Sequence, residues 1–278
     1  MSIWVLLAVL FAAFLHAGWN AIIKGGVNAH ASMAILAVGH ALIGLALIGA
    51  HEWPVAQVWP WLAASACIHA AYQLFLSLAY EQGDLSRVYP IARGTAPLIV
   101  LVVSALFLAD PLSVAEIAGI VTLGLGIALL AWGVIGQGES RRLLPFAFGS
   151  ALATAGYTLA DGLGARVWGQ PLAYVAWLMV LSGVIYLPLI MAWKGRSVLA
   201  AGGRAWVMGL AAAAASFLAY AIIVWAMTRA PIALVGALRE TSVLFALLLG
   251  WRLFGERLDA GKLVAAGLIM LGVAVTRL

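Results

Sequence analysis

Charged side chains are scarce in this sequence. Asp, Glu, Lys and Arg make up 9% of its 278 residues, whereas hydrophobic residues make up 65%. A typical soluble domain has about 25% charged residues and about 45–50% apolar ones. A soluble fold of this size cannot bury that much apolar surface, so lipid must solvate most of the chain. The composition therefore excludes an ordinary water-soluble enzyme or binding domain.

Cysteine is almost absent, because Cys67 is the only one. A single thiol excludes an intramolecular disulfide and a zinc site with four cysteine ligands. The phosphate-loop pattern G-x-x-x-x-G-K-[ST] is also missing, which argues against ATP hydrolysis within this chain. The net charge of +5 does not indicate nucleic-acid binding, since the basic residues stand singly and form no patch. We predict that the protein is not an enzyme, needs no cofactor or metal, and binds no nucleic acid.

Long apolar segments are what the sequence has in abundance. A helix that crosses the hydrocarbon core of a bilayer needs about 20 mostly apolar residues. The first segment lacks the basic start and small-residue cleavage site of a signal peptide, so we interpret it as a retained span. We predict an all-α membrane protein of ten transmembrane helices, at residues 4–23, 31–50, 58–79, 85–108, 114–135, 144–165, 171–192, 205–228, 231–254 and 260–277.

The basic residues predict how these spans are oriented. Most of the 15 Lys and Arg lie at loops or span ends, and loops rich in them face the cytoplasm. This rule predicts a multi-pass protein of the inner (cytoplasmic) membrane with both termini on the non-cytoplasmic side. The cytoplasmic group is Lys24, Arg87, Arg141, Arg142, Lys194, Arg196, Arg204, Arg252, Arg257 and Lys262, and the opposite group is Arg166, Arg229 and Arg277.

The second half of the chain repeats the first. ARGTAPLIVLVVSALFLADPLSVAEIAGIVTLGLGIALL, from Ala92, aligns without a gap with LRETSVLFALLLGWRLFGERLDAGKLVAAGLIMLGVAV, from Leu238. The alignment pairs Arg93 with Arg239. We therefore predict two five-helix halves, residues 1–138 and 139–278. Because five is odd, the halves must be inverted relative to each other, and such repeats usually bind substrate near the bilayer midplane.

Ten spans arranged as five plus five, together with these two segments, resemble the drug/metabolite transporter superfamily, EamA type. The sequence departs from that pattern in having Ser242-Val243 where a proline is common and Asp110 where Glu is usual. The resemblance implies secondary transport of small metabolites, often export. It covers essentially the whole chain and does not name a substrate.

Two arginines interrupt the apolar spans. Arg93 and Arg239 are each the ninth residue of a predicted span, so each lies roughly 12 Å below its membrane surface. A charge at that depth costs about 2.5–3.5 kcal/mol, and we expect both side chains to face a polar interior and bind an anionic group. The alternative is neutralisation by Asp161 or Glu240. Since adjacent helical residues do not share a face, we expect Glu240 to have a partner other than Arg239.

Other polar residues recur at helical spacing inside the spans and predict a lined cavity. Hydrogen bonds between helices are the competing explanation. The carboxyl groups of Glu240 and Asp161 are candidates for proton coupling because burial favours the neutral form of a carboxyl, and His69 is a candidate because histidine titrates near neutrality. The remaining predicted substrate-binding residues are Tyr89, Tyr72, Gln73, His16, Asn20, Tyr157 and Tyr220.

These features predict a secondary transporter of a small polar metabolite that is anionic or zwitterionic. Its acidic group would be a phosphate, phosphonate or carboxylate, amino acids included, and protons are a possible coupling ion. The halves would alternate access to the site by rocking. A flippase for a lipid or lipid-linked sugar and a non-transporting membrane scaffold remain alternatives. The bilayer and the small-molecule substrate are the predicted partners.

Overall fold

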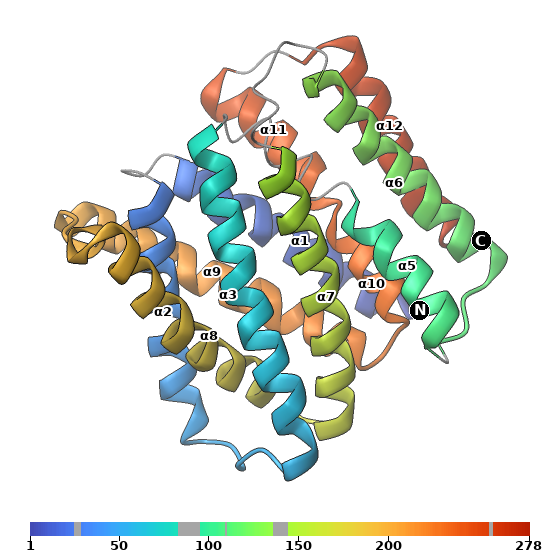
Figure 1. Ribbon diagram of the computed structural model, residues 1–278. Helices are drawn as coiled ribbons and strands as arrows, with labels where there is room; N and C mark the ends of the chain where they lie inside the picture. Colours follow the sequence, from blue (N-terminus) through green and yellow to red (C-terminus); the bar gives the residue numbers. More distant parts are fainter. Residues whose placement is uncertain (25–28, 83–94, 109, 136–143, 256–257) are drawn as a thin grey trace.

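The computed structural model describes residues 1–24, 29–82, 95–108, 110–135, 144–255 and 258–278, and helices are their only regular secondary structure (Figure 1). The α-helices are α1 (Ile3–Lys24), α2 (Ala29–Ile48), α3 (Trp59–Gln82), α5 (Ala96–Phe107), α6 (Val114–Ile135), α7 (Leu144–Trp168), α8 (Pro171–Lys194), α9 (Gly203–Met227), α10 (Ile232–Arg239), α11 (Ser242–Phe254) and α12 (Ala260–Val275). The short 3₁₀ helices η1 (Ala56–Val58) and η3 (Arg196–Leu199) precede α3 and follow α8.

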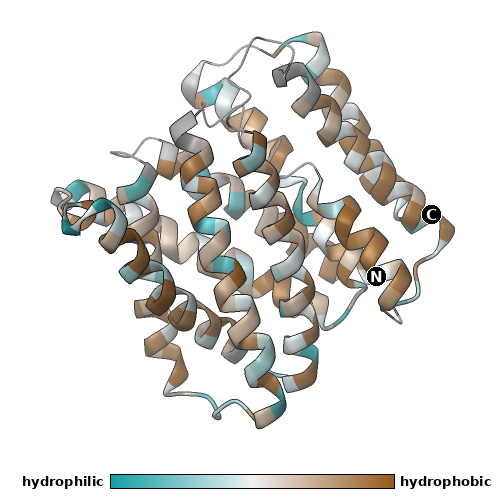
Figure 2. Ribbon diagram, in the orientation of Figure 1, coloured by the Kyte–Doolittle hydropathy of each residue, from teal (hydrophilic) through white to brown (hydrophobic). Residues whose placement is uncertain are grey.

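The all-α membrane class is confirmed. Within the described residues, seven helices are long and apolar enough to cross a membrane. Hydrophobic residues cover most of the helix length, while hydrophilic residues gather at several helix ends and in the middle of α3 (Figure 2). The boundaries follow from local chemistry, as in α8, which begins at Pro171. Proline suits the first helical position because its fixed φ matches the helix and its missing N–H has no partner there.

One predicted span is not a continuous helix. The segment 231–254 divides into α10, which ends at Arg239, and α11, which begins at Ser242. Between them the amide of Thr241 donates to the carbonyl of Leu238 at 3.1 Å, and the amide of Val243 donates to the carbonyl of Glu240 at 3.0 Å. These tight turns satisfy backbone groups that lipid cannot. The break therefore places Glu240 between two half-helices within the span.

The internal repeat extends to the helix starts. α5 begins at Ala96 and α11 at Ser242, which are partners in the repeat alignment, and the same holds for Val114 of α6 and Ala260 of α12. The helix that follows each aligned arginine thus begins at the same position in both halves. The predicted junction between the halves, at 138 and 139, lies outside the described residues.

The packing of the helices has two-fold pseudo-symmetry. α1 packs on α9 and α3 packs on α7, while α2 packs on α8 and α6 on α12. Exchanging the halves turns the first pair into the second and leaves the other two unchanged. With the five spans that the sequence predicts for each half, the second half crosses the membrane in the opposite sense. The fold is therefore two inverted five-helix repeats, with the α6–α12 pair along one edge (Figure 1).

A salt bridge joins the two halves at one membrane face. Arg166, near the end of α7, contacts both carboxylate oxygens of Asp110, at 2.7 and 3.0 Å. Its guanidinium also donates to the carbonyls of Met227 and Ala230, at 2.8 and 2.9 Å, and Asp110 accepts the amide of Ile232 at 3.0 Å. We call this set of contacts the Asp110–Arg166 tie. It fixes the loop before α6 to the turn between α9 and α10.

Glycines bring α6 and α12 into close contact. A Cβ atom at Gly272 would lie 2.6 Å from the backbone nitrogen of Leu123 and 2.7 Å from the carbonyl oxygen of Gly119. Backbone atoms cannot move aside as a flexible side chain can. Small residues let membrane helices approach in this way, and van der Waals packing then holds them together.

We predict that Gly272→Leu lowers the thermal unfolding temperature of the purified protein, because overpacking a tight contact typically costs about 1–3 kcal/mol. The matched control is Gly267→Leu on the same helix, where an added Cβ meets no atom within 4 Å. Both substitutions raise helix propensity equally, so their difference isolates the contact with α6. Equal unfolding temperatures for the two variants would contradict this account.

Candidate functional site

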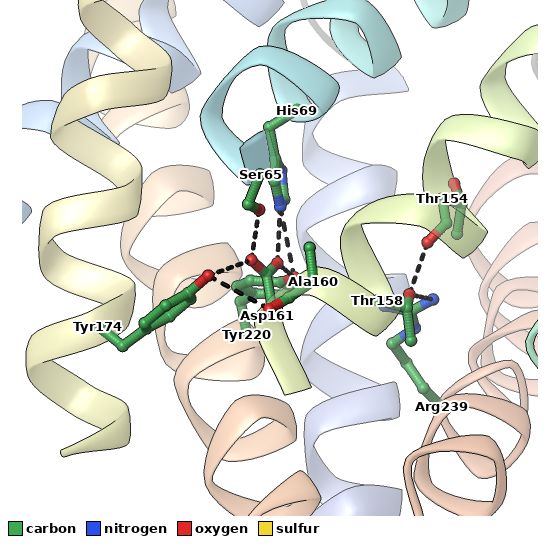
Figure 3. A network of polar contacts seen from close by, with 9 residues as sticks. All are labelled: Ser65, His69, Thr154, Thr158, Ala160, Asp161, Tyr174, Tyr220 and Arg239. Carbon is green, nitrogen blue, oxygen red and sulfur yellow. Dashed lines mark hydrogen bonds and ion pairs between the residues drawn. The ribbon is translucent and has the colours of Figure 1, made fainter. Parts of the chain in front are cut away.

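Asp161 is the centre of a buried polar cluster. It lies on α7 with none of its surface exposed, and four side chains from three other helices reach its carboxylate (Figure 3). His69 of α3 lies 3.0 Å from Oδ2, and the hydroxyl of Tyr174 of α8 donates to Oδ1 at 3.1 Å. Ser65 of α3 donates to Oδ1 and Tyr220 of α9 donates to Oδ2. Each carboxylate oxygen therefore has two partners. We call these five residues the Asp161 cluster.

Local sequence explains how the cluster forms. Ser65 and His69 are four residues apart and so share a face of α3. Gly164 makes room for Tyr174, since a Cβ at this position would lie 2.7 Å from the tyrosine hydroxyl and 2.7 Å from the Cβ of Trp61. A buried carboxylate without partners costs several kcal/mol. The four partners offset that cost and tie α7 to α3, α8 and α9.

A second cluster forms at the break between α10 and α11. Arg239 is 4% exposed and Glu240 is fully buried. The Nε and Nη2 atoms of Arg239 donate to Glu240 Oε1 at 3.2 and 3.1 Å, and Nη2 also donates to the Thr158 hydroxyl at 3.3 Å. That hydroxyl donates its own proton to the carbonyl of Thr154 at 2.6 Å, so its oxygen is available as an acceptor. We call Arg239 and Glu240 the buried ion pair.

The structure pairs Glu240 with Arg239, a contact that the helical-face argument did not anticipate. α10 ends at Arg239 and Glu240 is its C-cap residue. Adjacent side chains point apart only where the helix continues past both of them. In the structure, Arg239 forms an ion pair with Glu240, as the alternative prediction of internal neutralisation described.

Tyr157 connects the two clusters. Its ring stacks on His69 with centroids 4.1 Å apart, and the Arg239 guanidinium lies 5.7 Å from its centroid, within the range of a cation–π contact. Tyr72 and Tyr220 meet the same ring edge-on, at 5.5 and 6.0 Å. The Tyr157 ring therefore lies between His69 of the Asp161 cluster and the charged Arg239, so a change of charge at either group acts on this one side chain.

The structure brings together most of the predicted site residues that it describes. His69 and Tyr220 contact Asp161, Tyr157 contacts His69, Tyr220 and Tyr72, and Arg239 and Glu240 adjoin this connected set through Tyr157. Arg93 and Tyr89 lie outside the described residues. In the part of the chain that the structure describes, no three His, Cys, Asp or Glu side chains are grouped as metal ligands.

The remaining predicted residues have different surroundings. On α1, Asn20 donates to the carbonyl of His16 at 2.7 Å and the Trp19 indole donates to His16 Nδ1 at 3.3 Å. Both bonds lie within α1 and do not link it to the Asp161 cluster. Gln73 is buried on α3, one turn beyond His69, and its Oε1 has no hydrogen-bond partner among the described residues.

Three residues of the two clusters were missed by sequence reasoning. Ser65 was detectable, because it precedes His69 by one helical turn. Thr158 could not have been found, because nothing in its own segment indicates a contact with Arg239. Tyr174 carries no periodic signal, since it lies in the first turn of α8 and reaches Asp161 only through tertiary packing.

Comparison with known proteins identifies the family. The model of the EamA-like transporter family matches residues 3–132 and, a second time, residues 142–278. The chain belongs to this family. The EamA-like fold is also seen in a solved structure, described only as the crystal structure of a protein, with a TM-score of 0.79 and 21% sequence identity over 99% of this chain and 98% of that one. No curated protein sequence matches this chain.

Membership of the EamA-like family makes this protein a membrane transporter of the drug/metabolite type with a ten-helix fold. The predicted resemblance is thereby confirmed. At 21% identity, the solved structure supports the fold alone. The two clusters are consequently the basis for any statement about what this EamA-like transporter carries.

We predict that Gly164→Ala lowers the unfolding temperature of the transporter, because the added methyl group displaces Tyr174 from Asp161. The cost of such overpacking is about 1–3 kcal/mol, against a gain of up to about 1 kcal/mol in helix propensity. Gly156→Ala on the same helix is the control, since its Cβ would meet only Ile68, at 3.6 Å. If Gly164→Ala is as stable as Gly156→Ala, the space around Tyr174 is not limiting.

Proposed function

We propose that this EamA-like transporter is a secondary carrier of a small zwitterionic metabolite, with an acidic group and an amine. A single observation supports this choice: the buried ion pair of Arg239 and Glu240, at the break in a membrane-spanning segment. The acidic group of the cargo is a carboxylate, phosphonate or phosphate, and amino acids are the simplest members of this class.

The argument rests on balancing buried charge. Without cargo, Arg239 and Glu240 neutralise each other at 3.1 Å. A zwitterion presents an anion to the guanidinium and an ammonium to the carboxylate, so it replaces one ion pair with two and leaves no charge unpaired. A simple anion would compete with Glu240 for Arg239 and offer no cation to that carboxylate, and a simple amine would compete with Arg239 for Glu240 and offer no anion to that guanidinium. Removing one partner of a buried pair typically costs about 3–5 kcal/mol, which disfavours both.

The surroundings of the pair suit this class of cargo. Arg239 presents a planar fork of donors that matches the geometry of a carboxylate or phosphonate. Tyr157, Tyr72 and Tyr220 supply aromatic surface beside it. Transporters with inverted repeats commonly bind substrate at broken helices near the bilayer midplane, and α10 and α11 form such a break.

The rest of the proposal follows from the sequence and the inverted fold. Arg93 is the repeat partner of Arg239, and we propose that it and Tyr89 complete the substrate site from the first half. We also propose that the substrate site is lined by His16, Asn20 and Gln73. We propose that the halves rock to alternate access, that transport is coupled to protons, and that both termini lie on the non-cytoplasmic side of the inner membrane.

The contacts at one membrane face support the proposed orientation. Arg166 contacts the turn between α9 and α10, and Arg277 donates to the carbonyl of Met1 at 2.8 Å. Both arginines belong to the group expected on the non-cytoplasmic side. The Arg277 contact also joins this group to Met1, which is expected on the same side.

We predict that Arg239→Gln lowers uptake of a radiolabelled amino acid into proteoliposomes at least about tenfold, the equivalent of about 1.4 kcal/mol of lost binding. Arg229→Gln is the matched control, because Arg229 is an exposed arginine that lies over Trp225. The double variant Arg239→Gln/Glu240→Gln removes both charges and leaves no buried charge unpaired. It folds without the penalty of the single variant and still fails to transport.

The class of cargo is tested by thermal stabilisation of the purified protein. Four probes are compared: an amino acid, the amine that lacks its carboxylate, the acid that lacks its amine, and a lipid-linked sugar. A ligand that binds only the folded state raises the unfolding temperature, and we expect this for the amino acid alone. Glu240→Gln should extend stabilisation to the simple acid. Stabilisation by the amine alone, or by lipid-linked sugars alone, would refute the proposed cargo and favour an amine carrier or a flippase.

A further inference from the structure

We propose that Asp161 is the binding site of the coupling proton, that it is separate from the substrate-binding ion pair, and that protons reach it along a buried polar stripe between α3 and α7. This inference rests on the proposed transport function and deepens it. The Asp161 cluster supplies the site, and Gln73, Thr154 and Ser150, which we call the α3–α7 stripe, supply the path.

The Asp161 cluster has the hydrogen-bonding flexibility that reversible protonation needs. As a carboxylate, Asp161 accepts from Ser65, Tyr174 and Tyr220 and contacts His69. When Oδ2 takes a proton, one of its neighbours must stop donating to it. The Tyr220 hydroxyl has an alternative acceptor in the His69 tautomer that carries its proton on Nδ1, because it also lies 3.3 Å from Nε2 of His69. A change of tautomer at His69 together with rotation of one hydroxyl thus lets the cluster satisfy both forms of Asp161.

The groups that face Asp161 make a proton a better ligand than a metal cation. The neighbouring titratable side chains are His69 from α3, Tyr174 from α8 and Tyr220 from α9, and beyond Tyr157 lies the neutral pair of Arg239 and Glu240. The three hydroxyls in the cluster donate toward the carboxylate. Sodium would need these oxygens to turn their lone pairs inward, and an imidazole nitrogen is a poor ligand for it.

The α3–α7 stripe contains buried oxygen atoms that lack partners. Oε1 of Gln73, Oγ1 of Thr154 and Oγ of Ser150 have no hydrogen-bond partner among the described residues, and all three residues are at least nine-tenths buried. More than about 90% of buried polar groups are bonded to protein or ordered water. A series of such oxygens is therefore a place where water molecules bind, and each typically makes about three hydrogen bonds.

The order of these oxygens along the helices makes them a path. Ser65 opposite Asp161, Ile68 opposite Gly156 and Phe75 opposite Gly149 set the antiparallel register of α3 and α7. This register places Gln73, one turn beyond His69, opposite residues 151–153 of α7, between Thr154 and Ser150 along the helix. Ser150 lies one turn beyond Thr154, about 16 Å along α7 from Asp161.

The path leads to the membrane face opposite the Asp110–Arg166 tie. On α7 the stripe runs from Asp161 toward Leu144, at the start of the helix, whereas Arg166 lies near its other end. In the proposed orientation, the stripe therefore opens toward the cytoplasmic side. Protons then have a route to the cluster that does not pass through the ion pair that binds the cargo.

Coupling follows from the position of Tyr157 between the two sites. A proton from the aqueous phase adds to the Asp161 carboxylate to give a carboxylic acid, and the same O–H bond breaks when the proton leaves on the other side. Either step changes the charge next to His69, whose ring stacks on Tyr157, and Tyr157 in turn lies beneath Arg239. The state of the proton site is thus transmitted to the substrate site through one ring.

The proton site is tested without any substrate by infrared spectroscopy of the purified protein across a range of pH. A protonated buried carboxyl gives its own C=O stretching band. We expect this band to disappear on alkalinisation in the wild type, to be absent from Asp161→Asn and to remain in Glu240→Gln. A band that persists in Asp161→Asn and is lost in Glu240→Gln would overturn the assignment.

A second variant keeps the test decisive if Asp161→Asn fails to fold. Tyr220→Phe removes one donor to the ionised form of Asp161, so the band should persist to more alkaline pH. The control is Tyr186→Phe, because the Tyr186 hydroxyl is also buried but has no partner among the described residues. A purely structural role for Tyr220 would leave the pH dependence of the band the same in both variants.

The path is tested in proteoliposomes with the radiolabelled amino acid. We expect a pH gradient to drive accumulation by the wild type, Asp161→Asn to lose this accumulation but retain exchange of labelled for unlabelled amino acid, and Gln73→Leu/Thr154→Val to slow accumulation at least about threefold. Gln57→Leu/Thr122→Val makes the same changes outside the stripe and should be neutral. Accumulation driven by sodium, or unaffected by the stripe variants, overturns the proposal. If the wild type does not transport the probe at all, the proposed cargo fails while the infrared result still decides the proton site.

Discussion

The need to neutralise charge inside lipid determines how this bundle is built. Asp161, Arg239 and Glu240 lie in the interior of an otherwise apolar molecule, where an unpaired charge costs several kcal/mol. The chain meets this cost by bringing α3, α7, α8 and α9 together around one carboxylate and by breaking a span so that two adjacent residues can pair. The positions of these helices therefore follow from the polar side chains as much as from the apolar ones.

Sequence patterns predicted the spans well because their physical basis is simple. Lipid imposes a length and an apolar composition on any helix that crosses it, so α6 has the predicted bounds 114–135 and α8 begins at the predicted Pro171. The repeat carried further information, since the starts of α5 and α11 are partners in its alignment. His69 and Asp161 were also predicted, because a polar residue in an apolar span is conspicuous.

What could not be predicted depends on contacts between distant segments. The hydropathy of residues 231–254 is continuous, and no glycine or proline lies at the point where Glu240 interrupts the helix. The break becomes favourable only because Arg239 donates hydrogen bonds to Glu240 and Thr158 at this point. In the same way, Tyr174 reaches Asp161 only because Gly164 allows α8 to approach. Such relations are tertiary and leave no periodic trace in a single sequence.

The Asp110–Arg166 tie has a further consequence for the working cycle. Of its five hydrogen bonds, three join the halves, from Arg166 and Ile232 to Asp110, and two hold Arg166 to the carbonyls of Met227 and Ala230 within the second half. Under the proposed rocking, any movement that widens this face has to break the three bonds to Asp110 and rehydrate both ions. If the halves rock as proposed, the rate at which this face opens is sensitive to the ionic strength of the solution on that side alone.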